Sequence, residues 1–315
     1  MCIALISTAH PDYPFILANN RDEHLDRPTL PADWWQEPNT HVLGGRDLQR
    51  PIQGTWLGIT AQGRIAVLTN FREEGQNFSG LKSRGGIVNA YLTTPPTATE
   101  TTAAFATRLV EQIGVRDVGG FSLVFGQLRR HESRLAVVSN RTPDARGVVW
   151  IADALGQTHG LSNAHYGDLS WPKVVHGEQL LRQLVHSHVT RGAGKEDLVE
   201  RLFDLLSVDT LPKRREGEDW QTYVAQLRNS IFIPRVGGEE VASQPGDEIA
   251  AAKSTGQEAG GSHGLYATQK QTIILVDCKG HVTFIERTTF DEQGRETAES
   301  SNRRTFEFDI EGWET

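Results

Sequence analysis

Cys2 stands directly behind the initiator methionine, and it is one of two cysteines in 315 residues. Removal of Met1 would place a thiol and a free α-amine on the same residue. Because an α-amine has a pKa of about 8, it can act as the base that takes the proton of its own thiol. Cys2 is therefore a candidate nucleophile for acyl transfer. The alternative is that Cys2 is a small apolar core residue, the common role of a solitary cysteine in a strand.

A second group of reactive side chains follows in the stretch "YPFILANNRDE", which spans residues 13–23. If the preceding His-Pro-Asp turn closes a hairpin, this strand runs antiparallel to residues 2–7 and returns toward Cys2. Arg21 could then stabilise a thiolate, and Asp22 could hold the α-amine. Alternation along a regular strand places Arg21 and Asp22 on opposite faces, so both reach Cys2 only if the strand ends or bulges there. The letters "NRDE" are also typical of a charged turn with a weak surface ion pair.

The elements that must position these residues are mostly strands. Apolar runs rich in β-branched residues predict strands, and apolar residues at helical spacing predict helices. Strands, then a helical block, then further strands favour an α+β architecture over alternating βαβ units. The predicted strands are residues 2–7, 13–20, 54–60, 64–70, 120–128, 134–140, 147–153, 271–277 and 281–290, and the predicted helices are 97–114, 177–189, 195–209 and 220–233.

The chain is expected to form one domain over residues 1–290. Between residues 236 and 264 there is almost no large apolar side chain, which predicts a flexible insertion. Residues 291–315 are expected to be a polar C-terminal tail.

Composition excludes several classes of protein. The net charge is −8, with no long cluster of lysine and arginine, so we expect no nucleic-acid partner. The sequence contains no run of 18 apolar residues, so we expect no transmembrane helix. Any contact with a membrane would then be transient. Two cysteines suit a reducing compartment and a cytoplasmic protein, with mitochondrial or Golgi association left open. No Cys/His cluster has the spacing of a zinc site, and we predict no metal site.

Short motifs then occur in a characteristic order along nearly the whole chain. This ordered set resembles the transport and Golgi organisation protein 2 family, also called the NRDE family. That family is itself similar to N-terminal nucleophile hydrolases of the choloylglycine hydrolase and penicillin acylase type. The resemblance implies an αββα four-layer sandwich with two antiparallel sheets. The motifs are "MCI" at 1–3, "ANNRDE" at 18–23, "GTWLGIT" at 54–60, "LTNFRE" at 68–73, "SRG" at 83–85, "GLSNA" at 160–164, "WPK" at 171–173, "TIILVD" at 272–277 and "FIER" at 284–287.

Matched by position, the resemblance also assigns roles to residues. Cys2 matches the nucleophile and Asp22 the aspartate that holds the α-amine. Asn70 and Asn163 fall where the hydrolases place polar groups around the oxyanion, whose stabilisation acyl transfer requires. The residues expected to contact the substrate are Asn20, Arg21, Glu23 and Arg72.

The arginines and the C-terminal strand depart from the hydrolase pattern. In the hydrolases the arginine stands three residues before the aspartate, where this chain has Asn19, and its own arginine is Arg21. Where family members often carry an arginine and serines, this chain has "QKQ" at residues 269–271. These departures concern the activity more than the fold.

Two functions follow from the resemblance. One is a protein that acts on or carries hydrophobic acyl or haem cargo in lipid or haem homeostasis and Golgi-linked trafficking. Its ligand would be an acyl-coenzyme A, a lipid or haem, and no cofactor would be required. The alternative is an enzyme, a cysteine N-terminal nucleophile acyl hydrolase or acyltransferase that cleaves an amide or a thioester.

Overall fold

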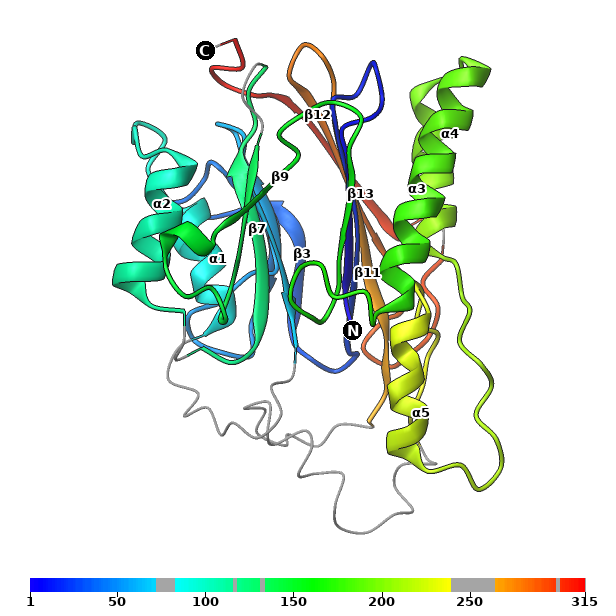
Figure 1. Cartoon of the computed structure of the whole chain (residues 1–315). Coiled ribbons are helices and arrows are strands. Elements are labelled where there is room, and N and C mark those ends of the chain that lie inside the picture. Colours follow the sequence, from blue (N-terminus) through cyan, green and yellow to red (C-terminus); the bar gives the residue numbers. More distant parts are fainter. Residues whose placement is uncertain (72–82, 116–117, 131–133, 239–263, 299–300, 315) are drawn as a thin grey trace.

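The protein is an αββα sandwich, seen edge-on in the computed structural model of Figure 1. The structure describes residues 1–71, 83–115, 118–130, 134–238, 264–298 and 301–314. Two antiparallel sheets pack face to face, and helices cover the outer face of each sheet. The expected fold class is confirmed.

The first sheet carries the N-terminal strand in its interior. Within the described residues its six strands run in the order β10-β1-β2-β11-β12-β13. Every pair is antiparallel. The strands are β1 (Ile3–Ser7), β2 (Phe15–His24), β10 (Thr158–Leu161), β11 (Tyr266–Val276), β12 (His281–Thr288) and β13 (Arg303–Asp309).

The second sheet is a meander in which each strand pairs with the next along the chain. Its seven described strands run in the order β3 to β9, again antiparallel throughout. They are β3 (Thr29–Trp34), β4 (Val42–Asp47), β5 (Leu57–Thr60), β6 (Arg64–Asn70), β7 (Phe121–Gln127), β8 (Leu135–Ser139) and β9 (Val149–Ile151). Sequence patterning predicts neither β3 nor β4, because Gly44, Gly45 and a proline interrupt their apolar runs.

The helices form the two outer layers. Helices α1 (Arg84–Leu92) and α2 (Thr102–Arg108), with the π-helical turn η1 (Leu109–Ile113), pack on the second sheet. Helices α3 (Pro172–Arg191) and α4 (Lys195–Leu206) pack on the first sheet, and α5 (Trp220–Gln226) follows them. Two short 3-10 turns, η2 (Ala145–Gly147) and η3 (Leu227–Asn229), complete the described helices.

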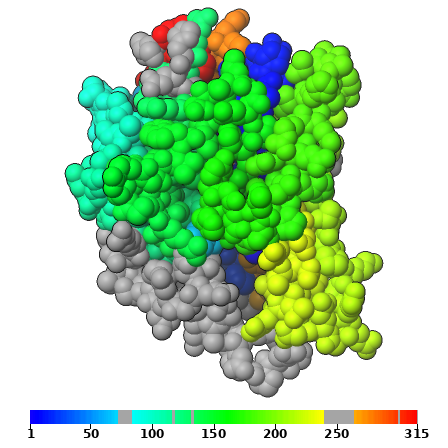
Figure 2. All heavy atoms as spheres, in the orientation of Figure 1, coloured from blue at the N-terminus to red at the C-terminus, as the bar shows by residue number. Residues whose placement is uncertain are grey.

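Strand β1 is buried on both faces. Ile3 and Leu5 contribute to the core under α3 and α4, whereas Ala4 and Ile6 contribute to the core between the sheets. This alternation is the two-residue period of a strand, with both faces covered. In the space-filling view, atoms of the middle of the chain, drawn green, cover most of the centre of one face (Figure 2). The strand that follows the candidate nucleophile is therefore held inside the sandwich, while Cys2 itself is half-buried.

The C-terminal segment belongs to the first sheet. Residues 291–315 were expected to be a polar tail, yet Arg303–Asp309 form β13, which pairs with β12. Charged side chains alternate there with Phe306 and Phe308, which pack against the core between the sheets. Trp313 is buried in the same core. The insertion expected at 236–264 lies almost entirely outside the described residues.

Gly177 sets the distance between α3 and β1. A Cβ atom at this position would stand 3.0 Å from a methyl carbon of Leu5 and 3.4 Å from one of Ile3. The missing side chain thus allows α3 to lie directly on the strand. This contact matters for the site, because the first turn of α3 lies next to the N-terminus (Figure 1).

We expect Gly177→Leu to lower the free energy of unfolding by about 1–3 kcal/mol, because the added side chain overpacks the contact with β1. Urea unfolding monitored by circular dichroism measures this change. Gln179→Leu, at an exposed position of the same helix, is the matched control and should change stability by less than about 0.5 kcal/mol. Equal effects of the two substitutions would contradict close packing at Gly177.

Candidate active site

The pairing of β1 with β2 brings Cys2 to the end of β2. Ile3 pairs with Asn20, so the same register continued by one residue places Cys2 beside Arg21. The Sγ atom of Cys2 lies 3.8 Å from the main-chain oxygen of Asp22, to which the thiol donates. Burial raises the pKa of this thiol above its ordinary value. The thiol therefore needs a base before it can act as a nucleophile at neutral pH.

A buried carboxylate lies beside the N-terminal ammonium group. The Met1 nitrogen is 3.5 Å from Oδ2 of Asp22, and the ammonium group also donates to the Tyr266 hydroxyl. Thr268 donates its hydroxyl to Oδ1 of Asp22 at 2.7 Å, which fixes the carboxylate. Burial lowers the pKa of the amine, although the charge of Asp22 opposes this shift. The structure thus places Asp22 where it can hold an N-terminal amine.

Lys173 contacts the same carboxylate from α3. Its Nζ atom lies 3.7 Å from Oδ2 of Asp22 and donates to the main-chain oxygen of Met1. The side chain is fully buried, and burial lowers its pKa despite the neighbouring negative charge. Sequence reasoning missed this residue. The available signal was a lysine directly after Trp-Pro, four residues before the helix predicted at 177–189.

Asn70 and Asn163 lie together and are joined to Cys2 through Ser162. The Ser162 hydroxyl donates to the Cys2 main-chain oxygen at 2.6 Å, and Thr69 donates its hydroxyl to the Ser162 main-chain oxygen at 2.7 Å. The side-chain amide of Asn163 donates to the main-chain oxygen of Asn70. The Asn70 Oδ1 atom is buried and accepts no hydrogen bond from the described residues. Four predicted residues, Cys2, Asp22, Asn70 and Asn163, are thereby brought into one region.

Arg21 and Asn20 point to opposite sides of β2. Arg21 lies between the sheets, with its guanidinium carbon 4.4 Å from the Trp56 ring centroid and a hydrogen bond to Gln269. Its positive charge favours the thiolate of Cys2. Asn20 lies on the helix side and donates to the main-chain oxygens of Leu206 and Ile231, both at 2.8 Å.

Asn20 therefore joins β2 to the helical layer, since its side-chain amide donates to the last residue of α4 and to the segment that follows η3. Asn20 and Asp22 lie on the same face of β2, as the two-residue alternation of a strand requires. The fourth residue expected to contact substrate, Arg72, lies outside the described residues.

Glu23 connects the site to a cluster of arginines. Its carboxylate lies 3.9 Å from Arg21 and 3.7 Å from Arg27, which in turn contacts Asp47 at 2.7 Å. Burial raises the pKa of Glu23, but the charges of the two arginines outweigh this and hold the pKa below its ordinary value. Glu23 is therefore an anion that fixes Arg21 near Cys2.

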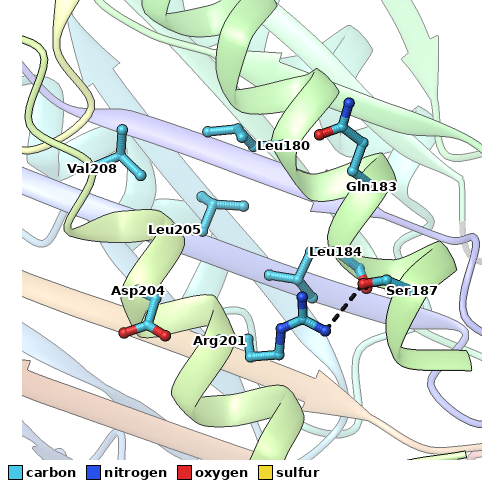
Figure 3. Close-up of a pocket in the computed structure, with 8 residues that line it drawn as sticks. All are labelled: Leu180, Gln183, Leu184, Ser187, Arg201, Asp204, Leu205 and Val208. Atoms are coloured by element: carbon cyan, nitrogen blue, oxygen red, sulfur yellow. Dashed lines mark hydrogen bonds between the residues drawn. The ribbon is translucent and has the colours of Figure 1, made fainter. Parts of the chain in front are cut away.

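Two hollows lie on the helical side. A cleft of about 210 Å³ is lined by the loop between β10 and α3 and shares Ser162 with the site; its other walls include Tyr166, Leu169 and Trp171. A larger hollow of about 410 Å³ opens between α3 and α4 and is lined by residues such as Leu184 and Arg201 (Figure 3). The larger hollow contains none of the predicted site residues, so the smaller cleft is the one relevant to Cys2.

Metal and membrane features are not found in the part of the chain that the structure describes. No group of three or more histidine, cysteine, aspartate or glutamate side chains among these residues could hold a metal ion. None of the described helices is both long and apolar enough to cross a membrane.

The depressed pKa of Glu23 predicts a specific pH dependence. Stability supplied by this carboxylate is complete above its unfolded pKa of about 4.3 and is lost as the pH falls through the lower folded value. We expect Glu23→Gln to cost roughly 1–3 kcal/mol at pH 7 and to flatten the fall of stability below pH ~4.3. Chemical unfolding at a series of pH values measures both effects. Glu111→Gln, at an exposed position, is the control. If the stability of Glu23→Gln fell with pH in parallel with that of the unaltered chain, the role given to the Glu23 carboxylate would be wrong.

Comparison with solved structures returns low similarity. A bile acid hydrolase mutant from Clostridium perfringens gives a TM-score of 0.40 at 10% identity, covering 98% of each chain. A Caenorhabditis elegans N-acylethanolamine-hydrolyzing acid amidase ortholog gives 0.37 at 14% identity, covering 68% of this chain and 88% of that one. At such scores the chemistry has to be argued from the residues themselves.

Sequence comparison identifies the family. The chain is 30% identical to a Homo sapiens Transport and Golgi organization protein 2 homolog over 95% of this chain and 94% of the relative. It is 28% identical to the Mus musculus homolog, over 89% of this chain and 88% of the relative. The family model described as Transport and Golgi organisation 2 matches residues 1–291. The chain therefore belongs to the Transport and Golgi organisation 2 family.

Proposed function

We propose that the protein transfers acyl groups through Cys2, which attacks the carbonyl carbon of an amide or thioester. The observation that carries this proposal is the buried Asp22 carboxylate. It is fixed by Thr268 at 2.7 Å and lies 3.5 Å from the N-terminal nitrogen, one residue from the thiol. A carboxylate in this place orients an N-terminal amine, and an oriented amine is the base that an N-terminal nucleophile uses.

The proposed reaction begins after Met1 is removed. The Cys2 α-amine takes the thiol proton, and the thiolate sulfur forms a bond to the substrate carbonyl carbon. The carbonyl electron pair moves to oxygen, and amide donors near Asn70 and Asn163 stabilise the oxyanion. When the intermediate collapses, the amine or thiol leaving group departs with the proton held by the α-ammonium. Water or another nucleophile then attacks the acyl-cysteine and frees the thiol.

The pKa directions support this division of roles. Burial raises the pKa of the Cys2 thiol, so the thiol holds its proton until a base removes it. Burial lowers the pKa of the Met1 amine, and the same buried surroundings would favour a neutral amine on Cys2 once Met1 is removed. A base is most effective when its pKa lies near the operating pH.

The cleft beside Ser162 favours a lipophilic acyl group. Its walls include Leu169, Trp171 and Val174, and its volume of about 210 Å³ suits one end of an acyl chain rather than a whole lipid. We therefore propose a substrate or cargo from acyl metabolism, such as an acyl-coenzyme A.

A second proposed function, carriage of an anionic hydrophobic cargo such as acyl-coenzyme A or haem, rests on another observation. Arg21 and Lys270 pair directly across β2 and β11, and both are buried. One acidic neighbour of Lys270, Glu286, lies 3.8 Å away, and burial raises the pKa of that carboxyl. Two cations side by side suit phosphate or propionate groups. In this reading the protein serves lipid or haem homeostasis and Golgi-linked trafficking from the cytoplasm, with transient contact to Golgi or mitochondrial membranes.

Intact-mass spectrometry tests the enzymatic proposal. The protein is weighed before and after incubation with a long-chain acyl-coenzyme A. We expect a mass without Met1, followed by an acyl adduct that disappears in Cys2→Ala and persists in Cys278→Ala, the matched thiol control. A retained Met1, or an adduct that survives Cys2→Ala, would contradict catalysis by Cys2.

Calorimetric titration tests the carrier function on the same ligand. Arg21→Ala should weaken acyl-coenzyme A binding by about tenfold or more, because it removes a charged partner of an anion. Cys2→Ala should leave binding unchanged, and Arg21→Lys should retain part of it. Equal losses in Arg21→Ala and Cys2→Ala would count against a separate carrier role.

A further inference from the structure

We propose that Lys173 is a positioning residue whose ammonium group remains the charged partner of the Asp22 carboxylate. The α-amine of Cys2 is thereby kept unprotonated. This inference rests on the proposed acyl-transfer function and deepens it. It concerns how the base is prepared, and it assigns a role to a buried lysine that the sequence pattern did not predict.

The geometry places Lys173 close to the amine of the mature chain. Its Nζ atom donates to the main-chain oxygen of Met1. That oxygen and the Cys2 nitrogen are bonded to the same carbonyl carbon, so standard peptide dimensions put them roughly 2.3 Å apart. After removal of Met1, the Cys2 amine would therefore lie within about 5 Å of Nζ.

Asp22 carries one negative charge and faces two amines. Its Oδ1 atom accepts the hydroxyl of Thr268. Its Oδ2 atom accepts no hydrogen bond from the described residues and lies 3.5 Å from the Met1 nitrogen, one residue before the Cys2 nitrogen, and 3.7 Å from Nζ of Lys173. A buried carboxylate can neutralise one ammonium group, and a second buried positive charge is strongly disfavoured.

The amine that gives up its proton is the weaker base. An unperturbed lysine has a pKa of about 10.4 and an α-amine a pKa of about 8. Burial lowers the pKa of Lys173 and that of the N-terminal amine alike, so the α-amine, which starts from the lower value, loses its proton first. Lys173 then remains the partner of Asp22. The other groups that act on the Met1 amine, one residue before Cys2, are the Cys2 thiol and Glu23, each of which favours its protonation, and the Tyr266 hydroxyl, to which it donates.

The position of Lys173 in α3 shows that the helix itself does not stabilise the buried lysine. It is the second residue of the helix, where the positive end of the helix dipole disfavours a cation. Lysine side chains are also rarely buried without a charged partner. The full burial of Lys173 is therefore explained by Asp22 and the N-terminal main chain. In the proposed reaction Lys173 exchanges no proton; the thiol proton moves to the α-amine alone.

The experiment measures the α-amine pKa directly, without a substrate. The chain is produced behind a cleavable leader whose removal leaves residue 2 as the first residue, in a Cys2→Ala background so that the thiol does not react. Competitive acetylation over a range of pH, read by mass spectrometry of the N-terminal peptide, gives the pKa of the α-amine. Circular dichroism of each variant confirms folding.

We expect a pKa below 8 with Lys173 in place and a rise of about one unit or more in Lys173→Met, because the neighbouring positive charge is lost and Asp22 becomes free to hold the ammonium form. Lys173→Arg keeps the charge and should keep the low value. Lys195→Met, which removes a half-buried lysine paired with Glu307 at the far end of the same helical layer, is the control and should leave the α-amine pKa unchanged.

Two results would overturn the proposal: an α-amine pKa at or above 8 in the chain that carries Lys173, or an unchanged pKa in folded Lys173→Met. The first needs no variant, so a Lys173→Met chain that failed to fold would leave the proposal testable. Because no substrate is involved, these results are separate from those of the acyl-adduct experiment. A low, lysine-dependent pKa without any acyl adduct would contradict the enzymatic function and retain the role of Lys173.

Discussion

The structure depends on a buried negative charge, the carboxylate of Asp22. A carboxylate away from water is tolerated only with charged or hydrogen-bonding partners. Asp22 obtains them from three distant parts of the chain: the N-terminus, Thr268 in β11 and Lys173 in α3. The need to satisfy this charge explains why the N-terminus is held against the first sheet, beside the end of β2. It also explains why the first turn of α3 lies next to the N-terminus of the chain. Gly177 allows the close approach of this helix to β1.

The site has two sides with different chemistry. On the helix side of β2, Asp22 and the amines form the proton-handling part. Between the sheets, Arg21 lies over Trp56 and is fixed by Glu23, close enough for its charge to act on the Cys2 thiol. The regular alternation of β2 separates these two sets of groups. A ligand could therefore engage the cations between the sheets without any chemistry at the thiol.

Much of this arrangement follows from local sequence. The two-residue alternation of β1 and β2 and the turn between them predict the hairpin that brings Asp22 to the N-terminus. The order of strands and helices predicts the α+β class. The roles of Thr268 and Lys173 could not be predicted in this way, because their contacts with Asp22 come from tertiary packing across 246 and 151 positions. Strands β3 and β4 were missed because glycine and proline interrupt their patterns, and β13 because charged residues form its exposed face.

The pairing of β2 with β11 has a consequence for how the chain folds. These strands have more inter-residue contact than any other described pair of elements, and they join residues near position 20 to residues near position 270. Long-range pairing of this kind raises the contact order and slows folding, because the loop must close before the contacts form. Strand β2 would meanwhile expose an apolar edge while the rest of the chain is synthesised. The protein is thus expected to mature slowly and to depend on protection of that edge from aggregation.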